Sequence, residues 1–117
     1  MISRKGEFAR GKRHGQGTYT YPNGDAYTGR WANDLKNGQG VYTYAQMDVQ
    51  KEGEWVDGQL QGQSVIQYPD HVLLASFTGS DRFEAPVKFT FKSTGYETVV
   101  KDLTLVEQTV VAVPVEN

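Results

Sequence analysis

The chain contains no cysteine, and this absence excludes disulfide bonds and thiolate metal sites. It has no apolar run near the roughly 18 residues that a membrane-spanning helix needs. Its first residues, MISRKGEF, lack the apolar core of a signal peptide. We therefore expect a soluble, cytoplasmic protein, with association with a virion or another assembly as the alternative.

Basic residues are slightly fewer than acidic residues, and they are concentrated at the N-terminal end of the chain. The formal net charge is −2, from 12 basic and 14 acidic residues. Residues 1–14 hold five basic residues and one acidic residue, whereas residues 15–117 hold seven basic and thirteen acidic ones. The net negative charge of the whole chain disfavours nucleic acid as a partner, since contacts with phosphate groups need a basic surface. The basic start can contact an anionic surface or the acidic body of a neighbouring copy.

What the chain does have is glycine and aromatic side chains. Its 117 residues include 13 glycines, seven tyrosines, five phenylalanines and two tryptophans. This aromatic content argues against disorder, and the length suits one modest domain or one domain with a small appendage.

Three segments of the sequence repeat without a gap. They begin at Arg4, Tyr27 and Lys51 and read RKGEFARGKRHGQGTYTY, YTGRWANDLKNGQGVYTY and KEGEWVDGQLQGQSVIQY. Such a register signals a repeat architecture. The shared columns are Gly6, Gly29 and Gly53; Phe8, Trp31 and Trp55; Gly15, Gly38 and Gly62; and Tyr21, Tyr44 and Tyr68.

The repeated Gly-x-Gly is structural rather than a phosphate-binding loop. A phosphate loop requires a helix after its glycines, but HGQG is followed by TYTY, whose period-two alternation predicts a strand. The basic residues that flank HGQG are not expected to recur in the later copies. Each copy therefore predicts a β-hairpin, and PNGD after Tyr21 predicts a tight turn between copies.

Successive hairpins are expected to stack their aromatic side chains into rows, because one hairpin cannot bury its own apolar face. The glycine two residues before each aromatic residue projects to the same face and leaves room for a neighbouring ring. Trp31 and Trp55 should contribute most to the stability of the row. The predicted fold class is all-β: an open row of antiparallel hairpins followed by a small three-stranded β segment.

The pattern Y-x-G-x-W, G-x-G-x-x-x-Y and a P-x-G turn resembles the MORN (membrane occupation and recognition nexus) repeat. The resemblance covers about residues 4–68, with a degenerate fourth start at FTGSD, Phe77–Asp81, so that the array spans residues 1–81. In the second copy AQMDVQ replaces the proline and glycine of the turn. The resemblance implies an elongated, twisted row with an aromatic-lined groove, a non-catalytic role in scaffolding or protein binding, and anionic lipid as a further ligand class.

The C-terminal segment, residues 82–117, loses the repeat. PVKFTFKS alternates Val87, Phe89 and Phe91 on one face, and GYETVVKDLTL and QTVVAVPV follow as two more β-rich runs. The segment is similar to the end of PEGA and carboxypeptidase regulatory-like β modules. Three strands with one apolar face need a cover. They either pack on the last hairpin or pair with another chain, and the second alternative favours an oligomer.

Two groups of residues are candidate contact sites, and neither is catalytic. Some aromatic residues could line a peptide-binding groove, although most should form the row itself: Tyr21, Trp31, Tyr42, Tyr44, Trp55 and Tyr68. The basic residues of the first copy could contact an anion: Arg4, Lys5, Arg10, Lys12 and Arg13. The two histidines lack metal-ligand spacing, and Glu52 and Glu54 should share a solvated face. We expect no enzyme activity, no cofactor, no metal and no small-molecule substrate.

The sequence thus predicts a non-enzymatic interaction protein that presents a surface to a protein partner or to itself. One alternative is a structural subunit of a larger phage or bacterial assembly. The other is peripheral binding to anionic lipid through the basic first repeat.

Overall fold

The computed structural model describes residues 3–79 and 82–101, and every regular element in these ranges is a β-strand, as predicted. The strands are β1 (Ser3–Ala9), β2 (Lys12–Thr20), β3 (Ala26–Ala32), β4 (Leu35–Thr43), β5 (Gln50–Val56), β6 (Gln59–Gln67), β7 (His71–Gly79), β8 (Arg82–Phe91) and β9 (Glu97–Val100).

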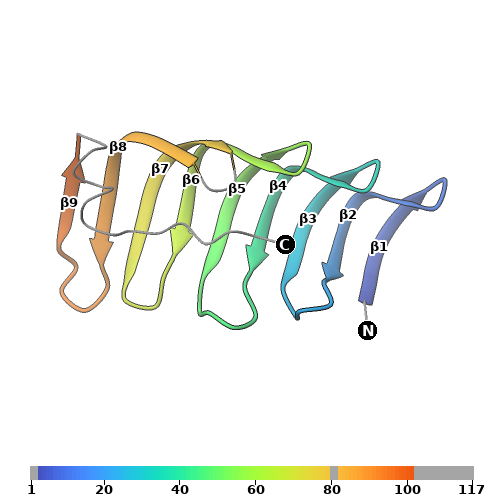
Figure 1. Ribbon diagram of the computed structural model, residues 1–117, viewed down its shortest axis with the longest axis horizontal. Coiled ribbons are helices and arrows are strands. Elements are labelled where there is room, and N and C mark those ends of the chain that lie inside the picture. Colours follow the sequence, from blue (N-terminus) through green and yellow to red (C-terminus); the bar gives the residue numbers. More distant parts are fainter. Residues whose placement is uncertain (1–2, 80–81, 102–117) are drawn as a thin grey trace.

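The nine strands form one open antiparallel sheet, and their order in the sheet is their order in the chain (Figure 1). Each strand therefore pairs only with its sequence neighbours, which is the arrangement expected of hairpins stacked in series. The molecule is elongated, with principal extents of 46 × 24 × 21 Å.

Two-residue turns close the first three hairpins, at the upper side in Figure 1. Both residues of each turn have positive φ, at 54° and 77°, 49° and 69°, and 48° and 85°. This is the type I′ geometry that matches the twist of paired strands. The turns are Arg10–Gly11, Asn33–Asp34 and Asp57–Gly58.

The connections between hairpins lie on the opposite side and differ in length. In the predicted PNGD turn, the backbone N–H of Tyr21 donates to the carbonyl oxygen of Asp25 at 2.7 Å. The second connection, which lacks that sequence, is longer and is closed by a bond from Tyr44 N–H to the Val49 carbonyl at 3.0 Å. The third is short, because Tyr68 N–H already bonds to the carbonyl of His71.

The register across the junctions defines the repeat unit. At each junction an aromatic residue lies opposite a glycine of the preceding hairpin. These pairs are Gly15–Trp31, Gly38–Trp55 and Gly62–Phe77.

This register corrects the predicted start of the fourth unit. Phe77 occupies the position of Trp31 and Trp55, and Leu73 occupies the position of Tyr27. The prediction that a fourth unit starts at Phe77 is therefore wrong by four residues. FTG resembles YTG, but the short third connection lets β7 begin earlier than the spacing of the first copies suggests.

The described part of the C-terminal segment is paired within its own chain. β8 pairs with β7, and β9 pairs with β8 after the predicted turn. Val87 and Phe89 are buried, whereas Phe91 is exposed. β8 thus continues the sheet from β7, and β9 continues it from β8. The third predicted run, in residues 108–115, lies outside the described residues.

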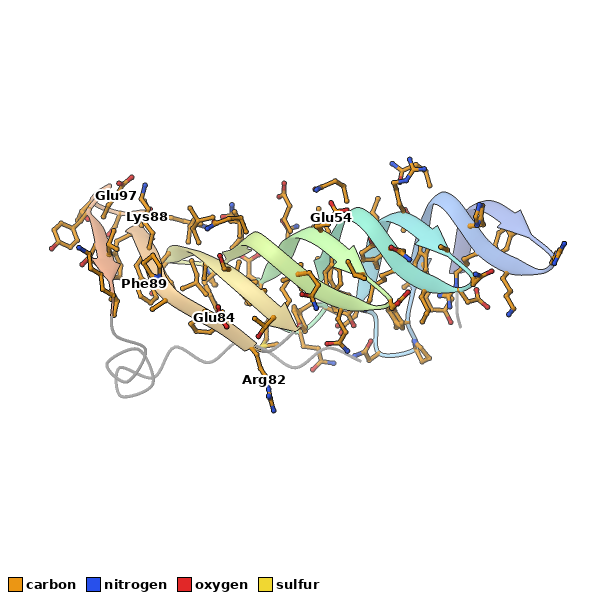
Figure 2. The ribbon with its side chains drawn as sticks, turned by 90° about the horizontal axis from the view of Figure 1, so that it is seen from above. Glu54, Arg82, Glu84, Lys88, Phe89 and Glu97 are labelled. Carbon is orange, nitrogen blue, oxygen red and sulfur yellow. The ribbon has the colours of Figure 1, made fainter. Side chains whose placement is uncertain are left out.

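The two faces of the sheet differ. The inner face, which carries both tryptophans, holds most of the core, and the outer face is mostly polar. From the outer face Lys88 forms an ion pair with Glu97 at 3.0 Å, and both lie on the same side as Glu54 (Figure 2). The buried apolar residues are Tyr27, Trp31, Tyr42, Tyr44, Val49, Trp55, Leu60, Ile66, Leu73, Ala75, Phe77, Val87 and Phe89.

Candidate binding surface

Four of the six aromatic candidates are core residues. Trp31, Tyr42, Tyr44 and Trp55 are at most 5% exposed, so their rings do not line an open groove. These four belong to the row of stacked rings, because stacking of the hairpins covers them. Tyr21 and Tyr68 are half-buried at the edge of the core. The list of aromatic contact candidates thus shortens to these two tyrosines.

Each tryptophan is fixed to the hairpin before it. Trp31 Nε1 donates to the carbonyl oxygen of Gly17 at 3.0 Å, and Trp55 Nε1 donates to that of Gly40 at 3.1 Å. Tyr27 lies edge-to-face against both rings, with centroid distances of 4.9 Å to Trp31 and 5.4 Å to Trp55. A side chain at Gly40 would collide with the ring of Tyr27. At Gly29 and Gly53, the glycines two residues before the tryptophans, it would first meet the backbone of β4 and the side chain of Ser64.

A basic side chain is held between two aromatic rings in each of the first two units. The Arg13 guanidinium lies 4.0 Å from the ring centroid of Tyr19 and 4.3 Å from that of Trp31. In both units one ring belongs to the same unit and the other is the tryptophan of the next, which makes a cation–π contact across the junction.

Lys36 repeats this arrangement in the second unit. Its ammonium lies 4.8 Å from the centroids of both Tyr42 and Trp55, and its side chain is buried. The expectation that the basic residues beside HGQG do not recur is therefore wrong for Arg13, since Lys36 stands in the same column of the repeat. The buried Leu60 takes this position in the third unit.

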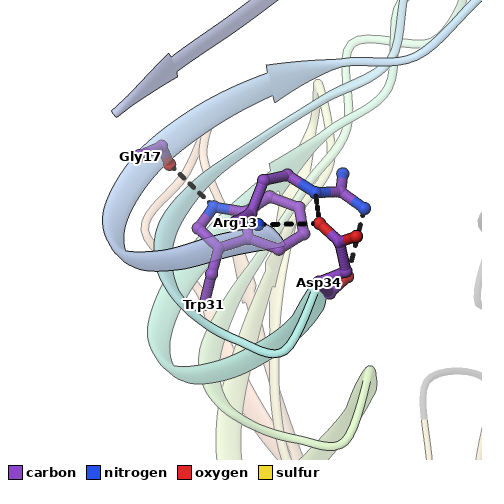
Figure 3. Close-up of polar contacts among 4 residues, drawn as sticks. All are labelled: Arg13, Gly17, Trp31 and Asp34. Carbon is purple, nitrogen blue, oxygen red and sulfur yellow. Dashed lines mark hydrogen bonds and ion pairs between the residues drawn. The ribbon is translucent and has the colours of Figure 1, made fainter. Parts of the chain in front are cut away.

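Arg13 is also bound to the next hairpin through Asp34 (Figure 3). Its Nε and its backbone N–H donate to Asp34 Oδ1 at 2.7 and 2.8 Å, and Nη2 donates to the Asp34 carbonyl at 3.1 Å. Arg13 is thus neutralised inside the array. It does not fit the predicted anion-contact role, because its charge already has a carboxylate partner.

The other basic candidates divide into two groups. Arg10 and Lys12 are exposed and flank Gly11 at the tip of the first hairpin. Arg4 and Lys5 lie on β1, and their side chains fall outside the described part of the structure. The described basic surface of the first unit is therefore a hairpin tip rather than a five-residue cluster.

Asp25 is a structural residue that the sequence analysis assigned only to a turn. Its buried carboxylate accepts hydrogen bonds from Tyr42 Oη at 2.8 Å and from the Ala45 N–H at 2.9 Å. It therefore ties the first connection to the second. The sequence feature that could have indicated this structural role was the position of Asp25 at the end of PNGD, directly before a strand.

Tyr68 stacks on His71 with ring centroids 4.4 Å apart, near the third connection. Burial raises the pKa of Tyr68 to about 12. The hydrogen bond between His71 and Asp70, at 2.6 Å, lowers the pKa of the Asp70 carboxyl. The other histidine, His14, is exposed on β2.

The acidic residues near Trp55 lie on the outer face. Glu52 and Glu54 are both exposed, as predicted, and Glu54 accepts a hydrogen bond from Gln39 Nε2 at 2.5 Å. Within residues 3–79 and 82–101, no three His, Asp or Glu side chains gather as a metal site requires. The same part of the chain contains no helix long and apolar enough to cross a membrane.

The chain matches a known protein family. The family model described as MORN repeat matches residues 5–26, 27–46 and 52–72, which is more than half of the chain. The three matches follow the first three hairpins of the sheet. No curated protein sequence matches the chain.

Proposed function

Since the chain belongs to the MORN repeat family, we propose that it is a non-enzymatic scaffold that binds a protein partner through its first hairpin. MORN repeats generally take part in binding proteins or lipids or in scaffolding. The proposal for this chain places the contact at the tip of the first hairpin, with Arg10 and Lys12 as the contact residues.

One observation supports this location: the basic residues of the first unit differ in exposure and in ion pairing. Arg13 is engaged by Asp34, whereas Arg10 and Lys12 project from a tight turn into solvent. A tip with two exposed basic side chains fits an acidic protein surface, because charges at an interface rim steer association with the opposite charge. Tyr21 and Tyr68 lie on the opposite side of the array and are weaker candidates.

A charge-reversal experiment tests the proposal. The full chain carrying Arg10→Glu and Lys12→Glu is compared with wild type in a cross-linked pull-down from the native host. The matched control reverses Lys92 and Lys101, which are exposed bases at the other end, by the same total charge. A partner that is retained by wild type and by the control but lost from the first variant supports the proposal. Equal recovery with all three chains contradicts it.

Anionic lipid is a second candidate, because the same exposed bases favour any anionic surface. Each basic residue near such a membrane contributes about 1 kcal/mol. Two of them give about 2 kcal/mol, which is weak for stable anchoring and is the reason for preferring a protein partner. Flotation with phosphatidylcholine vesicles, with and without phosphatidylserine, separates the two. Flotation that requires phosphatidylserine, and that the Arg10→Glu, Lys12→Glu variant loses, would favour anionic lipid as the ligand.

A further inference from the structure

The outer face of the sheet carries two exposed aliphatic side chains on neighbouring strands. Leu35 of β4 and Val56 of β5 are each 45% exposed, near the hairpin tips. Leu35 leans toward β5, because a Cβ added at Gly58 would lie only 3.9 Å from its Cδ2. On the other side Leu35 pairs with the half-buried Ala32 of β3. Adjoining apolar side chains with a polar rim indicate an interaction surface.

The charges beside this aliphatic pair have opposite signs on the two sides of β4. Arg30 of β3 lies on one side and Glu54 of β5 on the other, and both are exposed. They stand at the same level of the sheet: Glu54 is opposite Gln39, and Arg30 faces the stretch of β4 between Lys36 and Gly40. Within residues 3–79 and 82–101, neither Arg30 nor Glu54 belongs to an ion pair.

Opposite charges on the two sides of one strand make this surface complementary to a second copy of itself. When a second copy is turned over by half a turn about an axis along β4, its β5 lies over β3 of the first copy. Glu54 of each copy then faces Arg30 of the other, so the pair forms twice. Leu35 meets Leu35 at the axis, and Val56 meets Ala32. Sheets that pack face to face lie about 10 Å apart, which side chains of this length can span.

We propose that two copies of this chain pack through their outer faces, about a two-fold axis that runs along β4. Such a contact uses the same patch on both copies and closes with the dimer. Leu35 and Val56 supply the apolar area, and the two Arg30–Glu54 pairs fix the orientation, since charges across an interface determine register more than affinity. The contact centres on three strands, about 10 Å across, so it is small and its dissociation constant should be about 100 μM.

The proposed dimer leaves the first hairpin available. An axis parallel to the strands keeps the hairpin tips of both copies on the same side, so two tips with Arg10 and Lys12 are presented together. A partner with two acidic sites would bind this dimer more tightly than one chain, because its second contact is intramolecular. The dimer contact uses neither Arg10 nor Lys12, so this inference goes beyond the partner binding proposed above and does not depend on it.

A charge swap tests the contact in the full chain. Sedimentation equilibrium at up to about 1 mM compares wild type, Arg30→Glu, Glu54→Arg and the double variant with both changes. Each single change places two like-charge pairs across the axis, which should raise the dimer dissociation constant about tenfold. The double variant restores opposite charges and should return close to wild type. Lys92→Glu and Glu84→Arg make the same changes in net charge at exposed positions outside the patch, and they should leave the dissociation constant unchanged. A wild-type monomer at this concentration, or a double variant as weak as the single ones, overturns the proposal.

Cross-linking tests the geometry, and the absence of cysteine makes it simple. Chains with Arg30→Cys and chains with Glu54→Cys are mixed and oxidised, with the exposed Lys92→Cys as the control. The mixed disulfide should form faster than either like pair and faster than any pair that includes the control. Leu35→Cys, at the axis, should instead cross-link with itself. Preferential like pairs of Arg30→Cys or Glu54→Cys, or a Leu35→Cys chain that reacts with itself no faster than the control, would overturn the two-fold contact. Circular dichroism confirms that each variant retains the sheet.

Discussion

Truncation of the aromatic residue that recurs in each unit should cost stability in proportion to its burial. Phe8, Trp31 and Trp55 occupy the same repeat position, with 46%, 4% and 0% of their surfaces exposed. The same repeat position can therefore be compared within one chain at three degrees of burial. We expect the loss of unfolding free energy to increase from Phe8→Ala to Trp31→Ala to Trp55→Ala.

The magnitudes follow from packing and from one hydrogen bond. Truncating a buried tryptophan to alanine costs about 3–5 kcal/mol. Trp55→Ala also leaves the Gly40 carbonyl without its Nε1 donor, so the upper part of that range applies. Phe8 is half exposed in a single chain and forms no such bond, so Phe8→Ala should cost about 1 kcal/mol. Domains of this size have a total stability of about 5–15 kcal/mol.

Urea unfolding followed by far-ultraviolet circular dichroism measures all three variants, because the unfolding midpoint and slope of this mainly backbone signal can be compared between chains with and without a tryptophan. The protein concentration should be low, so that self-association does not cover Phe8. Trp55→Phe separates the two contributions, since it retains a ring and removes only the donor and part of the volume. Equal losses for Phe8→Ala and Trp55→Ala would refute the burial argument. A cost below about 1 kcal/mol for Trp55→Ala would refute the packing itself.

Two further predictions concern the polar contacts. A double-mutant cycle with Arg13→Met and Asp34→Asn should give a coupling energy of about 1 kcal/mol, moderated by solvent because the Asp34 side chain is 39% exposed. A coupling near zero in urea unfolding would contradict the contact. Burial raises the pKa of Tyr68 from 10.0 to about 12, so the unfolded chain releases this proton first, and stability should fall between pH 10 and 12. Tyr68→Phe should lose that part of the pH dependence, and an unchanged profile would argue against it.

The hairpin array could be predicted because the same pattern of glycine and aromatic residues occurs in three copies. Period-two alternation specified the strands, and PNGD specified the tight turn that the bond from Tyr21 N–H to the Asp25 carbonyl closes. The fourth unit was misplaced because register across a junction depends on the length of the connection. That connection ends at His71 and is shorter than the one before Gln50.

The inward basic residues were the least predictable feature of the site. Lysine and arginine usually lie at the surface, so a single sequence gives little reason to bury Lys36. The signal was present as a column, since Arg13 and Lys36 align beside the Gly-x-Gly, but the ring that covers each one belongs to the next unit. The carboxylate of Asp25 was missed for the same reason, because its partners belong to the next unit: Tyr42 lies on β4 and Ala45 in the second connection.

In the first two units the basic side chain packs against the tryptophan of the next unit, so the two ends of the array are not equivalent. Trimming by a protease at the N-terminal hairpin would remove Arg13 but leave Lys36 between its two rings. Trimming from the other side as far as β5 would take Trp55 away and leave the Lys36 ammonium with one ring fewer. Shortening from the front should therefore leave Trp31 without its acceptor at Gly17, whereas shortening from the back should leave a basic side chain without one of its two rings.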